Sequence, residues 1–155
     1  MERSGNYTLC EANIVLRMLG RSGLQRAGKA LPIWVKGDSI DLDMAIAGCT
    51  LLASSDDYFD GCHHWLYLLT QDGKLIDQLR MPDQFGYIEH VQVLSETAIS
   101  FGYMGTNDRW TLCVDRQGFR SFSWRELVAR PNRFLLARRH LKLHRTEGPP
   151  CSPAS

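Results

Sequence analysis

The chain has 155 residues, of which 44% are hydrophobic and 23% charged, and its net charge at neutral pH is +1. These values are those of an ordinary globular protein, and the length suits a single domain. No apolar stretch reaches the roughly 20 residues that a membrane-spanning helix needs, so we expect no membrane partner.

The five cysteines are odd in number and widely spaced, and no two of them form a C-x-x-C pair. This pattern is typical of a reducing compartment, in which cysteines are mostly buried thiols. The first residues, MERSGNYTLCEAN, lack the apolar region of a secretory signal. We therefore expect a cytoplasmic location.

The small net charge hides a separation of charge along the chain. Residues 38–96 contain eleven acidic side chains and two basic ones, whereas residues 109–145 contain ten basic and two acidic ones. Two such segments can form oppositely charged faces that steer a partner, or they can neutralise each other within the fold. Charge alone leaves both outcomes open.

The N-terminal elements give weak signals. Residues 10–19, CEANIVLRML, favour a helix that ends at Gly20, although an edge strand through residues 14–16 fits equally well. Residues 20–28 are expected to form a loop. The apolar residues 33–35 predict one strand before the central part of the chain.

The central part of the chain contains an internal repeat. Residues 40–55 can be laid over residues 87–102 with an offset of 47, and residues 64–79 over residues 109–124 with an offset of 45. The matched pairs of the first alignment are Met44 with Val91, Ile46 with Val93, Thr50 with Thr97, and Leu52 with Ile99. Those of the second are Trp65 with Trp110, Tyr67 with Leu112, Leu69 with Val114, and Gly73 with Gly118. The change of offset indicates a longer loop in the first copy.

Each copy is predicted to form four short strands with the alternation of a half-buried sheet. Residues 71–74 and 116–119 are expected to be tight hairpin turns in which a glycine takes a positive φ. The repeat resembles the blades of a β-propeller, although two blades are too few to close a ring. We therefore predict a mainly β fold with two four-stranded meanders, at about residues 40–80 and 87–124, that form a sandwich or a partial propeller.

The C-terminal part is predicted to differ from the repeats. A Ser-x-x-Glu capping box at residues 123–126 predicts a short helix at residues 124–129. Residues 133–143 fit either a second helix or a strand in which leucines alternate with basic residues. Residues 146–155 are expected to be a disordered tail, so that the folded domain covers residues 1–145.

The stretch DDYFDGCHHW, residues 56–65, is the densest group of polar and aromatic side chains. Asp60, Cys62 and His64 have the i, i+2 spacing that places metal ligands on one face of a strand, although a fourth ligand is not apparent. Alternatively, Cys62 is a nucleophile whose base comes from elsewhere in the chain. The candidate bases are His90, His140 and His144. We favour a third interpretation, a long strand-connecting loop equivalent to residues 102–109 of the second copy.

We predict that these two loops form one partner-binding surface, because corresponding loops of stacked repeats lie along one edge. Aromatic side chains surrounded by carboxylates are suited to a basic partner. The predicted binding residues are Asp56, Asp57, Tyr58, Phe59, Asp60, Tyr103, Met104, Asn107 and Asp108. The alternative is that Tyr58 and Phe59 pack back onto the sheet.

Residues 125–145 carry seven bases and two histidines against one acid, which raises the alternative of a nucleic-acid-binding module. More often, such an element docks its leucines on the domain while its charges stay solvated or pair with the protein's own acids. No RNP-type motif, zinc finger or recognition helix accompanies the basic residues, so we do not expect nucleic acid to be the main partner.

The sequence contains no Gly-rich phosphate loop, G-x-S-x-G or H-E-x-x-H motif, and we expect neither catalysis nor a cofactor. In its size, its blade-like repeats and its lack of motifs, the chain resembles the immunity proteins that bacteria carry against secreted or polymorphic toxins. The resemblance implies a non-catalytic protein that covers the basic active site of a cognate toxin, such as a nuclease. Three alternatives stay open: a metal or Cys-His site at Cys62 and His64, a nucleic-acid-binding module, and a subunit of a larger propeller-like assembly.

Overall fold

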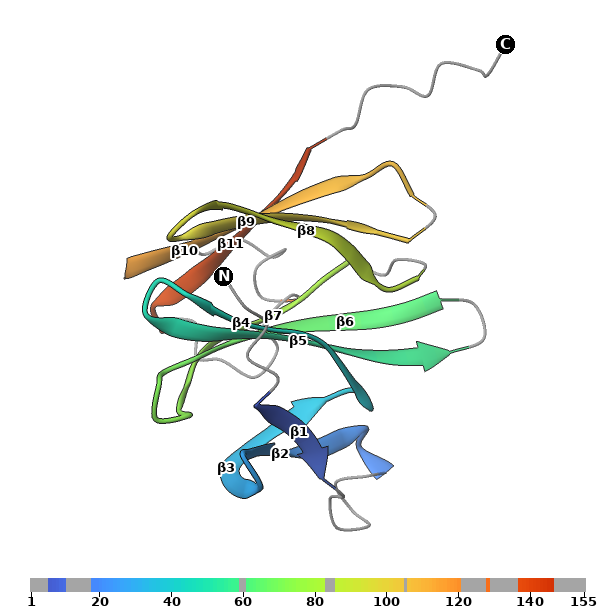
Figure 1. Cartoon of the computed structure of the whole chain (residues 1–155), viewed down its shortest axis with the longest axis vertical. Coiled ribbons are helices and arrows are strands. Elements are labelled where there is room, and N and C mark those ends of the chain that lie inside the picture. Colours follow the sequence, from blue (N-terminus) through green and yellow to red (C-terminus); the bar gives the residue numbers. More distant parts are fainter. Residues whose placement is uncertain are drawn as a thin grey trace.

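The computed structural model describes residues 6–10, 18–58, 61–82, 86–104, 106–120, 128 and 137–146. These residues form eleven strands in three antiparallel sheets (Figure 1). The first sheet contains β1 (Tyr7–Cys10), β2 (Arg21–Arg26) and β3 (Lys29–Lys36). The second contains β4 (Ser39–Ile46), β5 (Cys49–Tyr58), β6 (Gly61–Leu69) and β7 (Leu75–Arg80). The third contains β8 (Ile88–Ser95), β9 (Ala98–Tyr103), β10 (Arg109–Phe119) and β11 (Arg139–Thr146).

The predicted mainly β class is confirmed, and each of the two four-stranded sheets is a meander of consecutive strands. The pairing of β5 with β6 places Leu52 opposite Tyr67, and the pairing of β9 with β10 places Ile99 opposite Leu112. These are the residues that the repeat matches. Nowhere in the described ranges does a helix combine the length and apolar character that crossing a membrane requires.

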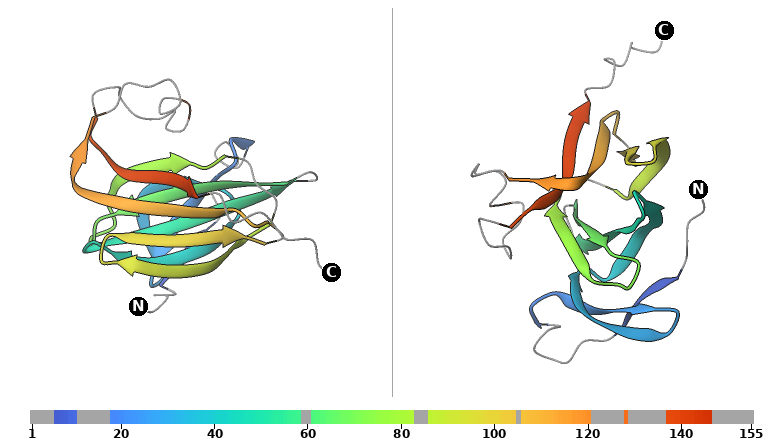
Figure 2. Two further views of the ribbon diagram at one scale, coloured as in Figure 1. Left: turned by 90° about the horizontal axis from the view of Figure 1, so that it is seen from above. Right: turned by 90° about the vertical axis from the view of Figure 1, so that its left-hand side faces the viewer.

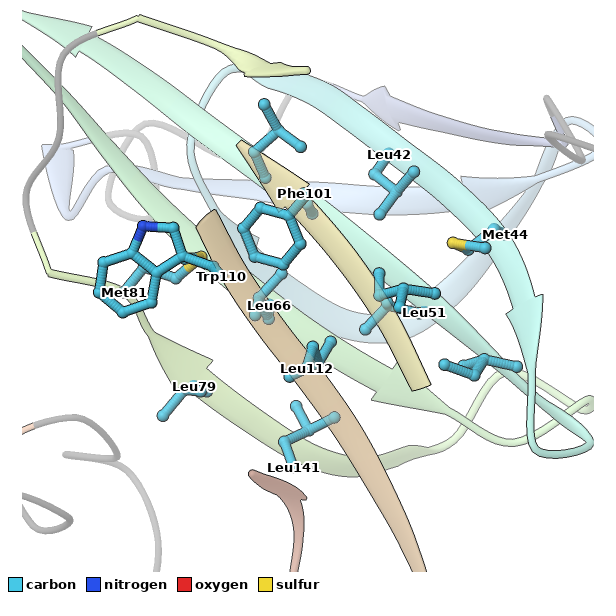
Figure 3. Close-up of a cluster of buried hydrophobic side chains, with 14 of the residues drawn as sticks. Leu42, Met44, Leu51, Leu66, Leu79, Met81, Phe101, Trp110, Leu112 and Leu141 are labelled. Carbon is cyan, nitrogen blue, oxygen red and sulfur yellow. The ribbon is translucent and has the colours of Figure 1, made fainter. Parts of the chain in front are cut away.

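The three sheets are stacked, and the β4–β7 sheet lies in the middle (Figures 1 and 2). Because side chains alternate between the two faces of a strand, neighbouring residues of β5 enter different interfaces. Leu51 packs toward the β8–β11 sheet with Leu66, Phe101 and Leu112 (Figure 3). Leu52 packs toward the β1–β3 sheet, in a cluster with Leu24, Val35, Tyr67 and Leu69. The middle sheet is therefore buried on both faces.

The N-terminal sheet corrects one expectation and confirms another. Residues 20–28, expected as a loop, contain β2, which pairs with both β1 and β3. Its sequence RSGLQR has a single large apolar residue, Leu24, so the alternation of apolar and polar residues that predicts a strand is missing. Leu24 is nevertheless buried, with an exposed fraction of only 1%. The predicted strand at residues 33–35 is confirmed as part of β3. Residues 11–17, which include most of the predicted helix, lie outside the described residues.

The last strand of the second repeat is not where the sequence predicted it. Gly73 has the expected positive φ of 83° in the turn between β6 and β7. Gly118 also has a positive φ, 72°, but β10 continues to Phe119 with a register shift after Val114. The carboxylate of Asp115 accepts hydrogen bonds from the backbone N–H groups of residues 117 and 118, which stabilises this irregular stretch.

The fourth strand of the third sheet is instead β11, which pairs with β10. The described part of residues 133–143 is thus a strand, one of the two predicted alternatives, and Thr146 belongs to it rather than to the tail. The predicted helix at residues 124–129 lies outside the described residues except for Val128, as does the rest of the tail.

Hydrogen bonds tie the middle and third sheets together at both edges. Asp77 of β7 is fully buried, and its carboxylate oxygen Oδ2 accepts from the N–H groups of His140 at 2.6 Å and Leu141 at 2.9 Å. At the other edge, the N–H of Ala47 donates to the carbonyl of Glu96 at 2.8 Å. These contacts fix the two sheets against sliding past each other.

Replacing either Leu51 or Leu52 with alanine is expected to lower the free energy of unfolding by about 2–5 kcal/mol, because each change empties a different buried interface of the middle sheet. Leu94→Ala is the control, since Leu94 is 56% exposed and its loss should cost about 0.5 kcal/mol or less. Urea unfolding followed by tryptophan fluorescence measures all three. A neutral result for Leu52→Ala alone would contradict the three-layer arrangement.

Candidate partner-binding surface

The stretch DDYFDGCHHW is a β-hairpin and not the long loop that we predicted. β5 and β6 pair up to the tip, with Asp56 opposite His63, Asp57 opposite Cys62, and Tyr58 opposite Gly61. Only residues 59 and 60 lie between the paired ends. The two extra residues of the first copy therefore lengthen the hairpin, and the many polar side chains hid its strand character. Phe59 and Asp60, both predicted binding residues, lie outside the described residues.

The two faces of the hairpin tip carry different side chains, since paired residues share a face. On one face Tyr58 stacks on His63, with ring centroids 4.4 Å apart, and Asp56 shares that face. On the other face lie Asp57 and Cys62, directed toward the third sheet. Tyr58 is 42% exposed, so it has not packed back fully onto the sheet.

Two further exposed side chains border the tip, and both belong to the third sheet or its flanks. The hydroxyl of Tyr87 donates to the carboxylate of Asp57, and the N–H of Met104 donates to the carbonyl of Tyr87 at 3.0 Å. Tyr87 is 45% exposed and Met104 is 53% exposed. The prediction included Met104 but missed Tyr87, whose only sequence signal is its place directly before a strand.

Hydrogen bonds from neighbouring side chains stabilise the ionised form of Asp57. Hydrogen bonds from the hydroxyl of Tyr87 and then from the thiol of Cys62 hold the pKa of the Asp57 carboxyl below its usual range. The same contact with Asp57 raises the pKa of the Tyr87 hydroxyl. At neutral pH the tip thus presents a carboxylate beside an intact phenol.

The second predicted loop contributes less to this surface than expected. Tyr103 is fully buried, and its hydroxyl donates to the sulfur of Met81 at 3.0 Å. Asp108 pairs with Arg145 at 2.7 Å, whereas Asn107 is exposed. We define the tip surface as the described residues that are exposed or half-buried around the hairpin end: Asp56, Asp57, Tyr58, Tyr87 and Met104.

Directly beneath the tip lies a buried polar cluster centred on His64. Its Nε2 atom is 3.0 Å from the carbonyl oxygen of Gly86, and its Nδ1 atom is 3.3 Å from Oδ2 of Asp41. The hydroxyl of Ser55 donates to the other oxygen of Asp41 at 2.9 Å. The ring of Tyr103 lies against that of His64, with centroids 4.9 Å apart. His64 therefore connects the middle sheet to the segment that enters β8.

The thiol of Cys62 is poorly suited to nucleophilic chemistry. Burial, together with the hydrogen bond to Asp57, raises its pKa to about 12, whereas catalytic cysteines have a lowered pKa. Of the three candidate bases, His90 contacts Glu89 at 3.1 Å and His140 contacts the carbonyl of Asp115 at 2.8 Å, whereas His144 lies in β11 opposite Thr111 of β10. In the part of the chain that the structure describes, no three His, Cys, Asp or Glu side chains are arranged to hold a metal ion.

The basic C-terminal strand pairs several of its charges within the protein. Leu141 and Leu143 contribute to the core, as the alternation predicted. Lys142 contacts Asp115 at 2.8 Å and lies over the ring of Phe119, and Arg139 is only 3% exposed. These contacts match the expected alternative in which the basic segment docks on the domain, and they leave fewer cations for phosphate groups.

Comparison with protein-family models, with curated proteins and with solved structures gave no match for this chain.

In the folded protein, Cys62 should react with iodoacetamide at neutral pH at least about tenfold more slowly than the half-buried Cys113, because its thiol is both buried and held protonated. Mass spectrometry of labelled peptides measures both rates in one sample. Unfolding in urea is the control and should make the two rates similar. Equal rates in the folded protein would show that Cys62 is an accessible and reactive thiol.

Proposed function

We propose that this is a non-catalytic protein-binding protein of the bacterial cytoplasm, an immunity protein that neutralises a cognate toxin by covering its active site with the tip surface. The observation that carries the proposal is the gathering of Tyr58, Tyr87 and Met104, all at least 42% exposed, around the ionised Asp57 at one end of the sheet stack.

This composition is that of a protein interface. Tyrosine and methionine are enriched in protein interfaces relative to the rest of the surface. Tyr58 and Tyr87 border the hairpin tip from its two faces, each held by a neighbouring side chain, His63 in one case and Asp57 in the other. Their rings therefore lose little further freedom when a partner covers them. We assign them the role of anchors.

The carboxylates define the kind of partner. Asp56 and Asp57 lie at the tip, on opposite faces of the hairpin. Carboxylates around an anchor accelerate encounter with a basic surface and penalise acidic ones. Enzymes that act on nucleic acids or other phosphate-bearing substrates expose basic active sites, and a hairpin that projects from a sheet stack is suited to enter such a cleft.

Capture from a lysate of the source cells tests the proposal. The tagged protein should retain one protein partner in equal amount, and adding purified protein to that partner should abolish its enzymatic activity. A partner whose activity is unaffected, or recovery of nucleic acid alone that is released by salt, would contradict the proposal.

The double variant Asp56→Lys/Asp57→Lys should weaken binding of this partner by about tenfold or more, mainly by slowing association. Glu96→Lys is the control, because it reverses one charge, half the charge change of the double variant, at an 89%-exposed side chain on a different turn, between β8 and β9. Surface plasmon resonance measures both rate constants, and circular dichroism checks the fold. Equal affinities of the two folded variants would remove the tip from the interface.

Met104→Ala should weaken the same complex mainly by speeding dissociation, because a buried anchor is lost. Leu94→Ala is its control, since Leu94 is similarly exposed but lies near the end of β8, away from its Tyr87 end. A dissociation rate that Met104→Ala leaves unchanged would contradict the anchor role.

A further inference from the structure

The N-terminal sheet differs from the rest of the protein in its charge. Its described residues, 6–10 and 18–36, contain no acidic side chain, and residues 11–17 add one acid and one base, whose charges cancel. Among the described residues, the bases of this sheet form no ion pair with a carboxylate. The sheet therefore has an excess of positive charge, which comes from Arg21, Arg26, Lys29 and Lys36.

Trp34 lies on the outer face of this sheet, which is the outermost layer of the stack (Figure 1). Its neighbour Val35 packs with Leu24 toward the middle sheet, and side chains alternate along a strand, so Trp34 points away from that sheet. Trp34 pairs with Gly23, and a Cβ built on Gly23 would lie 3.3 Å from a ring carbon of the indole. The indole thus lies against β2 where no side chain stands, while 48% of Trp34 stays exposed.

Two aliphatic side chains are exposed just before the start of β2. Met18 is 85% exposed and Leu19 is 59% exposed. Leu19 precedes Gly23, the pairing partner of Trp34, by four residues, and such a segment spans at most about 14 Å. Arg21 lies between Leu19 and Gly23. The first sheet thus presents exposed apolar side chains and a cation at the same end.

We propose that the N-terminal surface, formed by Met18, Leu19, Arg21, Lys29 and Trp34, binds the surface of a membrane that contains anionic lipids. Tryptophan is enriched where the apolar and polar regions of a bilayer meet, and exposed aliphatic side chains insert at the boundary of the acyl chains. Basic side chains are attracted to anionic head groups. Such a contact needs no spanning segment, the kind of membrane contact that the sequence analysis considered.

The side chains of this surface favour lipid over nucleic acid. Single-stranded nucleic acids are bound by cations together with several aromatic rings on which bases stack. Tyr7, the other ring among the described residues of this sheet, is buried, so Trp34 would offer a stacking position for one base. The exposed Met18 and Leu19 would have no function in a nucleic-acid complex, whereas a bilayer buries them.

Sedimentation of the full chain with lipid vesicles tests the proposal. The protein should bind vesicles of equal parts phosphatidylcholine and phosphatidylglycerol at low salt, and pure phosphatidylcholine vesicles at least about tenfold more weakly. Binding should shift the tryptophan emission to shorter wavelength, and Trp34→Phe should remove most of that shift. Equal binding to both kinds of vesicle would overturn the proposal, as would a failure to bind either.

The double variant Met18→Ser/Leu19→Ser should weaken binding to the mixed vesicles by about tenfold or more, because it removes the side chains that insert. Both residues are more than half exposed, so the variant should fold normally, which circular dichroism checks. Val93→Ser/Leu94→Ser is the matched control: this pair, 48% and 56% exposed, lies on β8 of the third sheet and should be dispensable. An equal effect of the two double variants contradicts the assignment to the N-terminal surface.

The cations are tested one at a time. Arg21→Gln and Lys29→Gln should each weaken vesicle binding by about fivefold, whereas Arg116→Gln, at a 58%-exposed side chain on β10, should leave it unchanged. Unchanged binding in both of the first two variants would overturn the role of the cations. Tighter binding to a single-stranded oligonucleotide than to the mixed vesicles would assign the surface to nucleic acid and overturn the proposal.

These results are separate from the proposed function, because the tip surface belongs to other strands and no toxin takes part in the vesicle experiments. A chain that ignores vesicles but whose tip variants lose the protein partner contradicts only the membrane proposal. A chain that binds vesicles but retains its partner in every tip variant contradicts only the immunity assignment.

Discussion

Burial of the middle sheet on both faces is the constraint from which the other features of this protein follow. Every side chain of β5 from Leu51 to Ser55 is buried, whichever way it points. The strands of the outer sheets supply the cover, so the extent of those sheets decides where the middle strands become exposed. At the paired ends of β5 and β6, Asp57 and Tyr58 become exposed although Cys62 stays buried, and there the tip begins.

Most buried polar groups of a sheet enclosed in this way are expected to find hydrogen-bond partners. Ser54 donates to the carbonyl of Lys36 at 2.6 Å, and the hydroxyl of Tyr67 accepts from the N–H of Lys36 at 2.8 Å, which joins the middle sheet to the first. Asp77 joins the middle sheet to the third sheet in the same way, by accepting hydrogen bonds from the backbone of β11. Apolar packing alone would tolerate several offsets between the sheets, whereas these directional bonds fit only one. The buried polar residues therefore select the alignment and the hydrophobic residues supply the stability.

The parts of the fold that follow from local rules could be predicted from the sequence. The alternation of apolar and polar residues, together with the turn glycines, predicted the two meanders. The match of Leu52 with Ile99 predicted that both meanders pair their strands in the same register. β2 pairs with its sequence neighbours β1 and β3 but has too few apolar residues for alternation to reveal it, whereas the pairing of β11 with β10 joins segments distant in sequence that local patterns do not encode. Gly118 shows the difference well: its positive φ was predicted, but the residue lies in an irregular stretch of β10 instead of a hairpin turn.

From the sequence, only the types of residue at the candidate site could be predicted, and not which of these residues are exposed. Asp57, Tyr58 and Met104 are exposed at the tip as expected, but Tyr103 has the same residue type and is fully buried, since a tyrosine suits both core and surface. Tyr87 belongs to the surface because it contacts Asp57, thirty residues earlier in the sequence. No sequence periodicity predicts that contact. The buried pair of His64 and Asp41 was likewise hidden, because the sequence suggested metal or thiol chemistry at these polar side chains and gave no sign of a partner on β4.

The late position of β11 affects how the chain can fold while it is being synthesised. β1 to β10 emerge from the ribosome in order, each next to its pairing partner, but β10 stays an open edge until residues 139–146 have followed. During that interval the carboxylate of Asp77 also lacks the two N–H groups that satisfy it in the finished protein. The third sheet can therefore be completed only after β11 has been synthesised, and until then the unpaired edge of β10 favours association with other nascent chains.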